Sequence, residues 1–164
     1  MIPQAQAKPK TNSSAAFVIK ILASGLGTGY SPVASGTVGS LLAAAIWWYL
    51  PESLALKLAL TALVLVISVP VSTAAEKLYG HKDDSRIVID EVAGMWLALL
   101  FFPVDIKHVA AAFFLFRLFD VIKPLGINKI QSLPGGWGIV VDDALAGILA
   151  NIVLRTALYL GAML

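Results

Sequence analysis

Hydrophobic residues run in long apolar stretches that short polar segments separate, a pattern that predicts apolar helices. A first stretch, 15–26, is short and contains Lys20. The five stretches that follow are 38–50, 54–75, 92–104, 109–119 and 144–164. The stretch 54–75, interrupted only by Lys57 and Pro70, is the best candidate for a membrane span, whereas several others are shorter than the ~20 residues that a span needs. We therefore expect an all-α, compact helical bundle embedded in the membrane, with about five apolar helices, some of them short or re-entrant.

Two parts of unequal length are expected along the chain. Residues 1–14 are a polar amino-terminal arm with Lys8, Lys10 and two prolines. The arm lacks the basic-then-apolar order of a signal peptide. Residues 15–164 have the usual size of one domain, so we expect a single helical domain there.

The composition indicates a membrane protein. Hydrophobic residues make up 59% of the 164 residues and charged residues 13%, against about 45–50% and about 25% in soluble domains, and the mean hydropathy is +0.85. A net charge of +2 is too small for a protein that binds nucleic-acid phosphates. The lack of cysteine excludes disulfides, thiolate catalysis and metal sites built on sulfur. A very apolar soluble bundle is the less favoured alternative.

Charged residues gather on one side when the five stretches are folded up and down with the amino terminus inside. The inner side then holds nine basic residues and the outer side only Lys57 and Lys107, as the positive-inside rule predicts. The nine are Lys8, Lys10, Lys20, Lys77, Lys82, Arg86, Arg117, Lys123 and Lys129. Seven of the ten acidic residues share that side: Asp83, Asp84, Asp90, Glu91, Asp120, Asp142 and Asp143. We expect a polar site there.

Two similar segments, 87–94 and 139–147, supply four of these acids. Each has an apolar triplet, a carboxylate pair and then small residues that allow close packing of two helices. The pairs are Asp90 with Glu91 and Asp142 with Asp143. Helix capping is one interpretation, because a first-turn carboxylate gains ~0.3–1 kcal/mol from the helix dipole. We favour a Mg²⁺ site made of all four, because clustered carboxylates near lipid need a cation to stay ionised and Mg²⁺ prefers carboxylate oxygen.

Arg117, Asp120 and Lys123 are spaced at i, i+3 and i+6, so they share a face near the inner end of a helix. Either they form an interfacial salt-bridge ladder, or Asp120 joins the metal site while Arg117 and Lys123 bind a phosphate group. Pro124 ends that helix.

The glycine-rich segment 25–40 opens into a helix and is either a structural loop or an anion site made of backbone amides. Thr37 and Ser40 are its candidate phosphate ligands, and Asp83 is an accessory candidate. Elsewhere, the run from Trp47 to Tyr49 predicts an aromatic belt at the outer membrane surface.

Four sequence blocks, taken together, resemble the bacterial phosphatidylglycerophosphatase A family from about Phe17 to Arg155. The blocks are 27–40 (GTGYSPVASGTVGS), 87–94 (IVIDEVAG), 116–124 (FRLFDVIKP) and 135–143 (GGWGIVVDD). Two positions depart from the family pattern: Ser35, where many members have proline, and Arg86, where a small or acidic residue is common. Neither departure removes a carboxylate.

The resemblance implies an all-helical, multi-pass enzyme of the bacterial inner (cytoplasmic) membrane with its active site facing the cytoplasm. It implies the Mg²⁺-dependent hydrolysis of phosphatidylglycerophosphate, a bilayer phospholipid, to phosphatidylglycerol and phosphate in phospholipid biosynthesis. The candidate catalytic residues are Asp90, Glu91, Asp142, Asp143 and Asp120.

Phosphate monoesters hydrolyse very slowly unaided, so charge neutralisation at the phosphoryl oxygens has to dominate catalysis. The nucleophile is either a water molecule on the metal or an aspartate. A small cation- or proton-coupled transporter is the alternative function, because it too places acids in membrane helices, although near the midplane.

Overall fold

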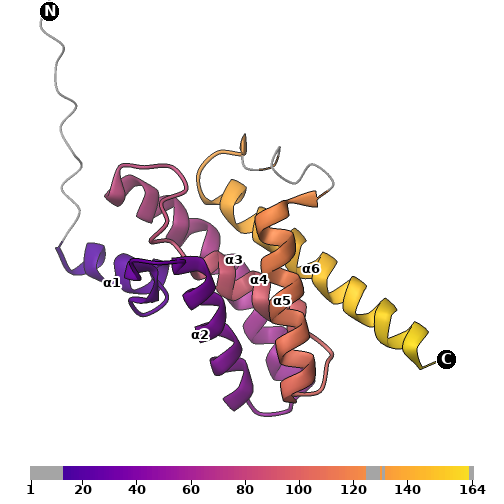
Figure 1. The fold of residues 1–164 in the computed structure, drawn as a ribbon. Helices are drawn as coiled ribbons and strands as arrows, with labels where there is room; N and C mark the ends of the chain where they lie inside the picture. Colours follow the sequence, from indigo (N-terminus) through magenta and orange to yellow (C-terminus); the bar gives the residue numbers. More distant parts are fainter. Residues whose placement is uncertain (1–12, 125–129, 131, 163–164) are drawn as a thin grey trace, which may run out of the picture.

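The chain is all-helical in the residues that the computed structural model describes, which are 13–124, 130 and 132–162. The elements are α1 (Ser13–Ala23), a short 3₁₀ turn η1 (Thr28–Tyr30), α2 (Ser35–Tyr49), α3 (Leu54–Tyr79), α4 (Ile89–Leu99), α5 (Ile106–Ile122) and α6 (Gly136–Gly161) (Figure 1). The predicted helical bundle is confirmed, and the short stretch 15–26 adds a sixth α-helix, α1. Most of the expected polar arm 1–14 lies outside the described residues.

Helix α4 lies at the centre of the bundle and packs against α2, α3, α5 and α6. Most of its residues are buried, and the indole nitrogen of Trp96 donates a 3.0 Å hydrogen bond to the carbonyl oxygen of Ala43 in α2. The ring of Trp96 also contacts Trp47, with 5.8 Å between ring centroids. The predicted aromatic belt is therefore wrong for Trp47, which is a core residue, whereas Trp48 and Tyr49 are exposed.

Glycines allow α4 and α6 to approach each other closely. A methyl group on Gly147 would collide with the carbonyl oxygen of Gly94. One on Gly94 would lie 2.6 Å from the ring of Phe116 and 2.7 Å from the carbonyl oxygen of Asp143. Small residues are the usual means of close helix contact in membranes. This contact brings the acidic segments of the two helices together, as their sequence similarity predicts.

Helix α6 also holds the other end of α4. The side-chain amide of Asn151 donates to three carbonyl oxygens at the carboxyl end of α4, those of Leu97, Ala98 and Leu100, at 2.8–3.1 Å. Arg155 donates to the Asn151 side-chain oxygen at 2.9 Å. The last carbonyl groups of a helix have no partner within that helix. Asn151 therefore supplies a partner to these carbonyl groups from a neighbouring helix.

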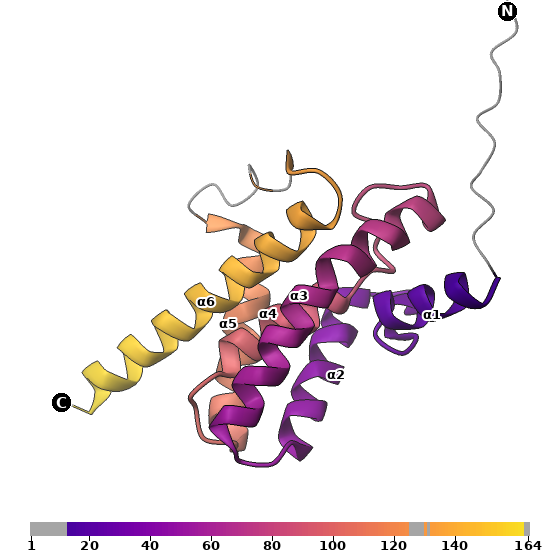
Figure 2. The same ribbon diagram turned by 180° about the vertical axis from the view of Figure 1, so that it is seen from behind.

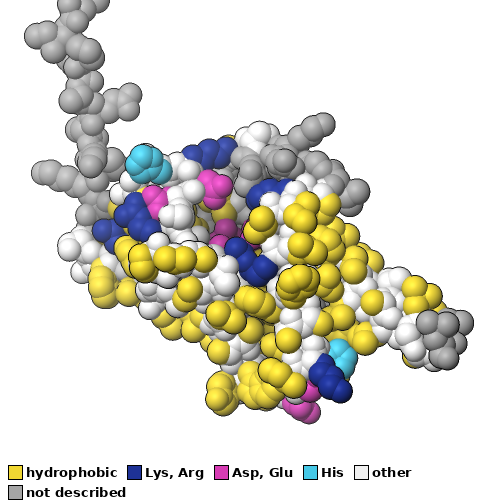
Figure 3. Space-filling model, in the orientation of Figure 1, with side chains coloured by type: hydrophobic (Ala, Val, Ile, Leu, Met, Phe, Trp, Pro, Cys, Tyr) yellow, Lys and Arg dark blue, Asp and Glu magenta, His cyan; other side chains and the backbone are white. Residues whose placement is uncertain are grey.

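Two helices, α3 and α6, are long and apolar enough to cross a membrane, with 26 residues each. Figure 3 shows charged side chains gathered at one end of the molecule, a broad hydrophobic flank, and a smaller charged group at the opposite end. The other bundle helices have only 11 to 17 residues. Spanning by α3, expected from its sequence, is consistent with this surface.

The close contact between α4 and α6 makes a stability prediction. Gly147→Ala should lower the free energy of unfolding by about 1–3 kcal/mol, the cost of overpacking, because the new methyl group meets backbone that cannot rotate away. Gly161→Ala is the matched control, since among the described residues no atom outside its own helix backbone and its chain neighbours lies within 4 Å of the position of its new methyl group. Denaturant titration in detergent micelles, followed by circular dichroism, measures both; equal stability of the two variants would contradict this packing.

Candidate active site

A polar cavity of about 580 Å³ opens at the end of the bundle where α2 and α4 begin and α5 ends. All seven acids that the charge pattern places on one side line it: Asp83, Asp84, Asp90, Glu91, Asp120, Asp142 and Asp143. Arg117 and Lys123 line it too. The acids therefore converge on one site rather than spreading over a surface.

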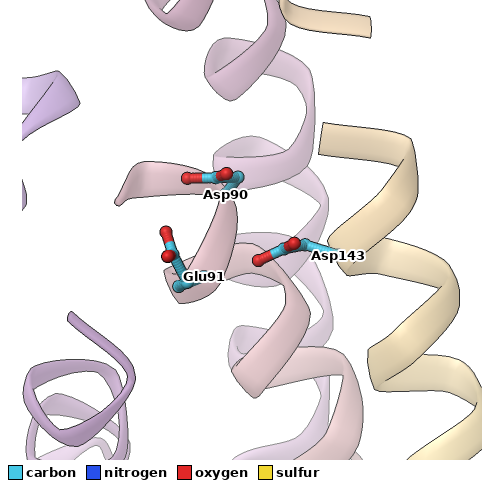
Figure 4. A group of neighbouring side chains, drawn as sticks. All are labelled: Asp90, Glu91 and Asp143. Carbon is cyan, nitrogen blue, oxygen red and sulfur yellow. The ribbon is translucent and has the colours of Figure 1, made fainter. Parts of the chain in front are cut away.

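Three carboxylates from two helices form the first group in this cavity (Figure 4). Asp90 and Glu91 stand in the first turn of α4, and Asp143 comes from α6. Each offers one oxygen atom, and these atoms all lie within 4.8 Å of one another. Asp90 and Asp143 are each only 5% exposed. The group therefore has the spacing of a single cation site.

The first group fits a divalent cation on the chemistry of its oxygen atoms. Oδ1 of Asp90, Oε2 of Glu91 and Oδ2 of Asp143 are buried, and none has a hydrogen-bond partner among the described residues. Burial raises the pKa of Asp90 well above its usual range. Burial, and after it the charge of Asp143, raises the pKa of Glu91 to about 8. A hard cation with a preference for oxygen, such as Mg²⁺, satisfies these atoms and favours their ionised form.

A second group, formed by Asp120, Asp142 and Asp143, shares Asp143 with the first. Here side-chain cations are already in place. Arg117 pairs with Asp120 at 2.7 Å, and the ammonium of Lys123 pairs with Asp142 and lies 3.8 Å from Asp120. Burial by itself would lower the pKa of Lys123, but its carboxylate partners raise it. The structure thus divides the four predicted metal ligands: three meet in the first group, and Asp142 is ion-paired.

The capping interpretation is wrong for the acids of α6. That helix begins at Gly136 with Gly135 as its N-cap, so Asp142 and Asp143 lie inside it rather than in its first turn. Glycines at 135, 136 and 138 favour a loop by propensity. Packing overrides that propensity, because the backbone amide of Gly136 donates to Thr73 of α3 at 2.8 Å.

The glycine-rich segment contributes through residues other than the predicted ones. Among its described residues, Ser35 and Gly36 line the cavity, but Thr37 and Ser40 do not. Ser40 is buried and its hydroxyl donates to the carbonyl oxygen of Gly36 at 2.8 Å. A methyl group on Gly36 would collide with Oε1 of Glu91. The signal for Gly36 was present in the sequence, as a glycine at the start of a helix.

Arg86 holds the acidic loop before α4. Its guanidinium binds both oxygens of Asp84 at 2.7 Å and lies 3.9 Å from the centre of the Tyr79 ring. The hydrogen bond from Arg86 lowers the pKa of Asp84, which therefore stays ionised on the cavity wall. Asp83 also lines the cavity, and its backbone amide donates to Glu76 at 2.9 Å. The departure from the family pattern at Arg86 thus has a structural role.

The fold and the cavity define an all-helical protein with helices of membrane length and a buried acidic site. Residues 21–158 match the family described as Phosphatidylglycerophosphatase A. The chain belongs to this family, as its four sequence blocks predict. It is therefore a lipid phosphatase, a phosphoric monoester hydrolase.

Three curated relatives cover most of the chain. A protein of Bacteroides thetaiotaomicron, provisionally named phosphatidylinositol-3-phosphatase, is 40% identical over 86% of this chain and 94% of its own length. The phosphatidylglycerophosphatase A of Escherichia coli is 40% identical over 79% of this chain and 77% of its own length. The phosphatidylglycerophosphatase A of Haemophilus influenzae is 36% identical over 86% of this chain and 89% of its own length. No solved structure matches the chain.

The raised pKa of Glu91 predicts that the binding of a divalent cation such as Mg²⁺ to this group depends on pH. Because Glu91 has to lose its proton to bind a cation, the apparent affinity should rise as the pH increases from about 4.5, the ordinary pKa of a glutamate, to about 8. Calorimetric titration in buffers of different ionisation enthalpy measures the protons released on binding. Glu91→Gln should weaken binding and reduce its pH dependence. An affinity that is constant across this range would contradict the prediction.

Proposed function

We propose that this lipid phosphatase hydrolyses phosphatidylglycerophosphate to phosphatidylglycerol and inorganic phosphate, with Mg²⁺ held by Asp90, Glu91 and Asp143. The main support is the first carboxylate group, whose buried oxygen atoms lack partners among the described residues. The names of the Escherichia coli and Haemophilus influenzae relatives support the choice of substrate.

The cations of the cavity are suited to binding the phosphate group. Bound Mg²⁺ would neutralise charge on the phosphoryl oxygens. The Nε atom of Arg117 is buried without a hydrogen-bond partner among the described residues, while Asp120 fixes the guanidinium from another side. Arg117 is therefore held ready to donate to a phosphoryl oxygen. Lys123, held by Asp142, adds a second positive charge on the cavity wall.

We infer that water is the nucleophile. Asp120 and Asp142 are paired with Arg117 and Lys123, which reduces their nucleophilicity, and the other three carboxylates are assigned to the cation. In the reaction the oxygen of water bonds to phosphorus and the water gives up one proton, the phosphorus–oxygen bond of the monoester breaks, and the leaving glycerol oxygen takes up one proton, so the number of protons is unchanged. A charged transition state of this kind is stabilised by donors that are fixed in advance.

We also propose that the enzyme is a multi-pass protein of the bacterial inner membrane with its cavity facing the cytoplasm. The support is the excess of basic residues that the sequence predicts for the inner side of the membrane. At the other end, Lys107 is exposed, but Lys57 is 6% exposed and its ammonium lies 5.0 Å from the centre of the Trp47 ring. The burial of Lys57 leaves Lys107 and Arg155 as the exposed basic residues at this end among the residues that the structure describes.

A phosphatidylinositol phosphate is a second candidate substrate. The relative from Bacteroides thetaiotaomicron, which carries a name of that kind, matches over 94% of its own length. Beside the carboxylate groups, the cavity has a polar wall with Ser31, Ser35 and Asp84, which suits a headgroup with several hydroxyl groups. The reaction would again be the hydrolysis of a phosphate monoester, as with phosphatidylglycerophosphate.

Phosphate release from three lipids tests the proposal. The purified protein in mixed micelles receives phosphatidylglycerophosphate, phosphatidylinositol 3-phosphate or phosphatidic acid, each with Mg²⁺ or with a chelator. We expect the highest kcat/KM with phosphatidylglycerophosphate, its loss with chelator and its recovery with added Mg²⁺. A preference for the inositol lipid would select the second candidate. Turnover that the chelator leaves unchanged would refute the assigned cation site.

Substitution by isosteric amides tests the assigned ligands one at a time. Asp90→Asn, Glu91→Gln and Asp143→Asn should each lower turnover ~100-fold or more, because an amide lacks the charge that holds Mg²⁺. Asp105→Asn is the matched control. Asp105 caps α5 at the opposite end by accepting backbone hydrogen bonds, which an amide oxygen also accepts. Near-normal turnover in all three site variants would place the chemistry elsewhere.

A further inference from the structure

Helix α1 has a hydrophobic face that no described part of the chain covers. Phe17 is 66% exposed, Val18 54% and Leu22 40%. The opposite face of the same helix contains Ile19 and Ala23, which pack into a small core at the base of the acidic segments. The helix is therefore apolar on its inner side and also on part of its outer side, while Lys20 is exposed.

The position of α1 differs from that of the bundle helices. Figures 1 and 2 show it lying across the direction of α2, beside the carboxyl-terminal half of α3. With 11 residues it is about 17 Å long, too short to span a bilayer. Leu26 and Val33, which follow α1 in the chain, are also exposed.

We propose that α1 lies in the plane of the membrane, with Phe17, Val18 and Leu22 inserted at the boundary between the headgroups and the acyl chains of the phospholipid bilayer. Large aromatic and aliphatic side chains exposed together on a short helix are typical of such interfacial helices. The neighbouring helix α3 is long and apolar enough to span the bilayer, so α1 has lipid within reach. Contact with lipid removes the exposed apolar area from water.

The connection between α1 and the active site gives this position a consequence. The carbonyl oxygen of Ala23, the last residue of α1, accepts a 2.8 Å hydrogen bond from the backbone amide of Val88. Val88 is the N-cap of α4, and Ile89 alone separates it from the acids Asp90 and Glu91. A helix fixed at the level of the headgroups therefore holds these carboxylates near the level at which lipid phosphates lie.

Depth measurement by spin labelling tests the proposal. Because the sequence has no cysteine, a thiol-reactive spin label attaches only to the one cysteine that each variant introduces. The full-length variants Phe17→Cys, Val18→Cys, Leu22→Cys and Lys20→Cys are labelled and placed in phospholipid vesicles. At the three apolar positions, collisions with oxygen should increase and collisions with a water-soluble nickel complex should decrease relative to Lys20→Cys. The three depths should be similar and shallow, as for a helix parallel to the surface.

Two further variants calibrate the depth scale. Val66→Cys, at an exposed position of α3, gives the hydrocarbon reference, and Lys107→Cys gives the water reference. Strong nickel collisions at all four α1 positions would place α1 in water and overturn the proposal. Exclusion of both reagents would show that protein, such as a second copy of the chain, covers this face, which would also overturn it. Because no substrate is present, the result is independent of the proposed reaction.

Discussion

The close approach of α4 and α6 is the contact on which the site depends. It is possible because Gly94 and Gly147 face each other without side chains, and it sets the carbonyl oxygen of Asp143 against Gly94. A wider spacing between the helices would move Asp143 away from Asp90 and Glu91, and the first carboxylate group would no longer exist. The residues that build the site and those that pack the core are therefore neighbours on the same two helices.

Carboxylates packed close together repel one another when they are ionised, and the two groups in the cavity differ in how this repulsion is reduced. In the second group, Arg117 and Lys123 provide positive charge from the end of α5, and each pairs with a carboxylate, Asp120 or Asp142. In the first group, buried oxygen atoms lack hydrogen-bond partners among the described residues, and burial raises the pKa of Asp90 and Glu91. Because the second group has side-chain cations as partners and the first group has none among the described residues, a metal cation is expected to bind at the first group. Fixed side-chain cations beside it are then available for the phosphate.

Much of this arrangement could be predicted from the sequence, because apolar stretches and clustered acids are local signals. The helical fold and the convergence of seven acids follow from such signals. The start of α6 could not be predicted, since Gly135 and Gly136 disfavour a helix and packing against α3, including the hydrogen bond to Thr73, stabilises it. The burial of Trp47 likewise depends on Trp96, which is distant in sequence. The division of the acids into two groups depends on which carboxylates Lys123 reaches, and spacing along one helix does not specify that.

The lengths of the helices set the level of the site relative to the lipid. The 26-residue helices α3 and α6 measure about 39 Å, more than the ~30 Å of bilayer hydrocarbon, whereas α4 with 11 residues measures about 17 Å. In the proposed multi-pass arrangement, a central helix this short has at least one end at membrane depth, where free carbonyl groups are costly. Asn151 satisfies three of these carbonyl groups at one end, and the carboxylates and their cations occupy the other. Because α4 is short, both of its ends lie between the two long apolar helices. Its carboxyl end is hydrogen-bonded by Asn151, and its amino end carries the polar site.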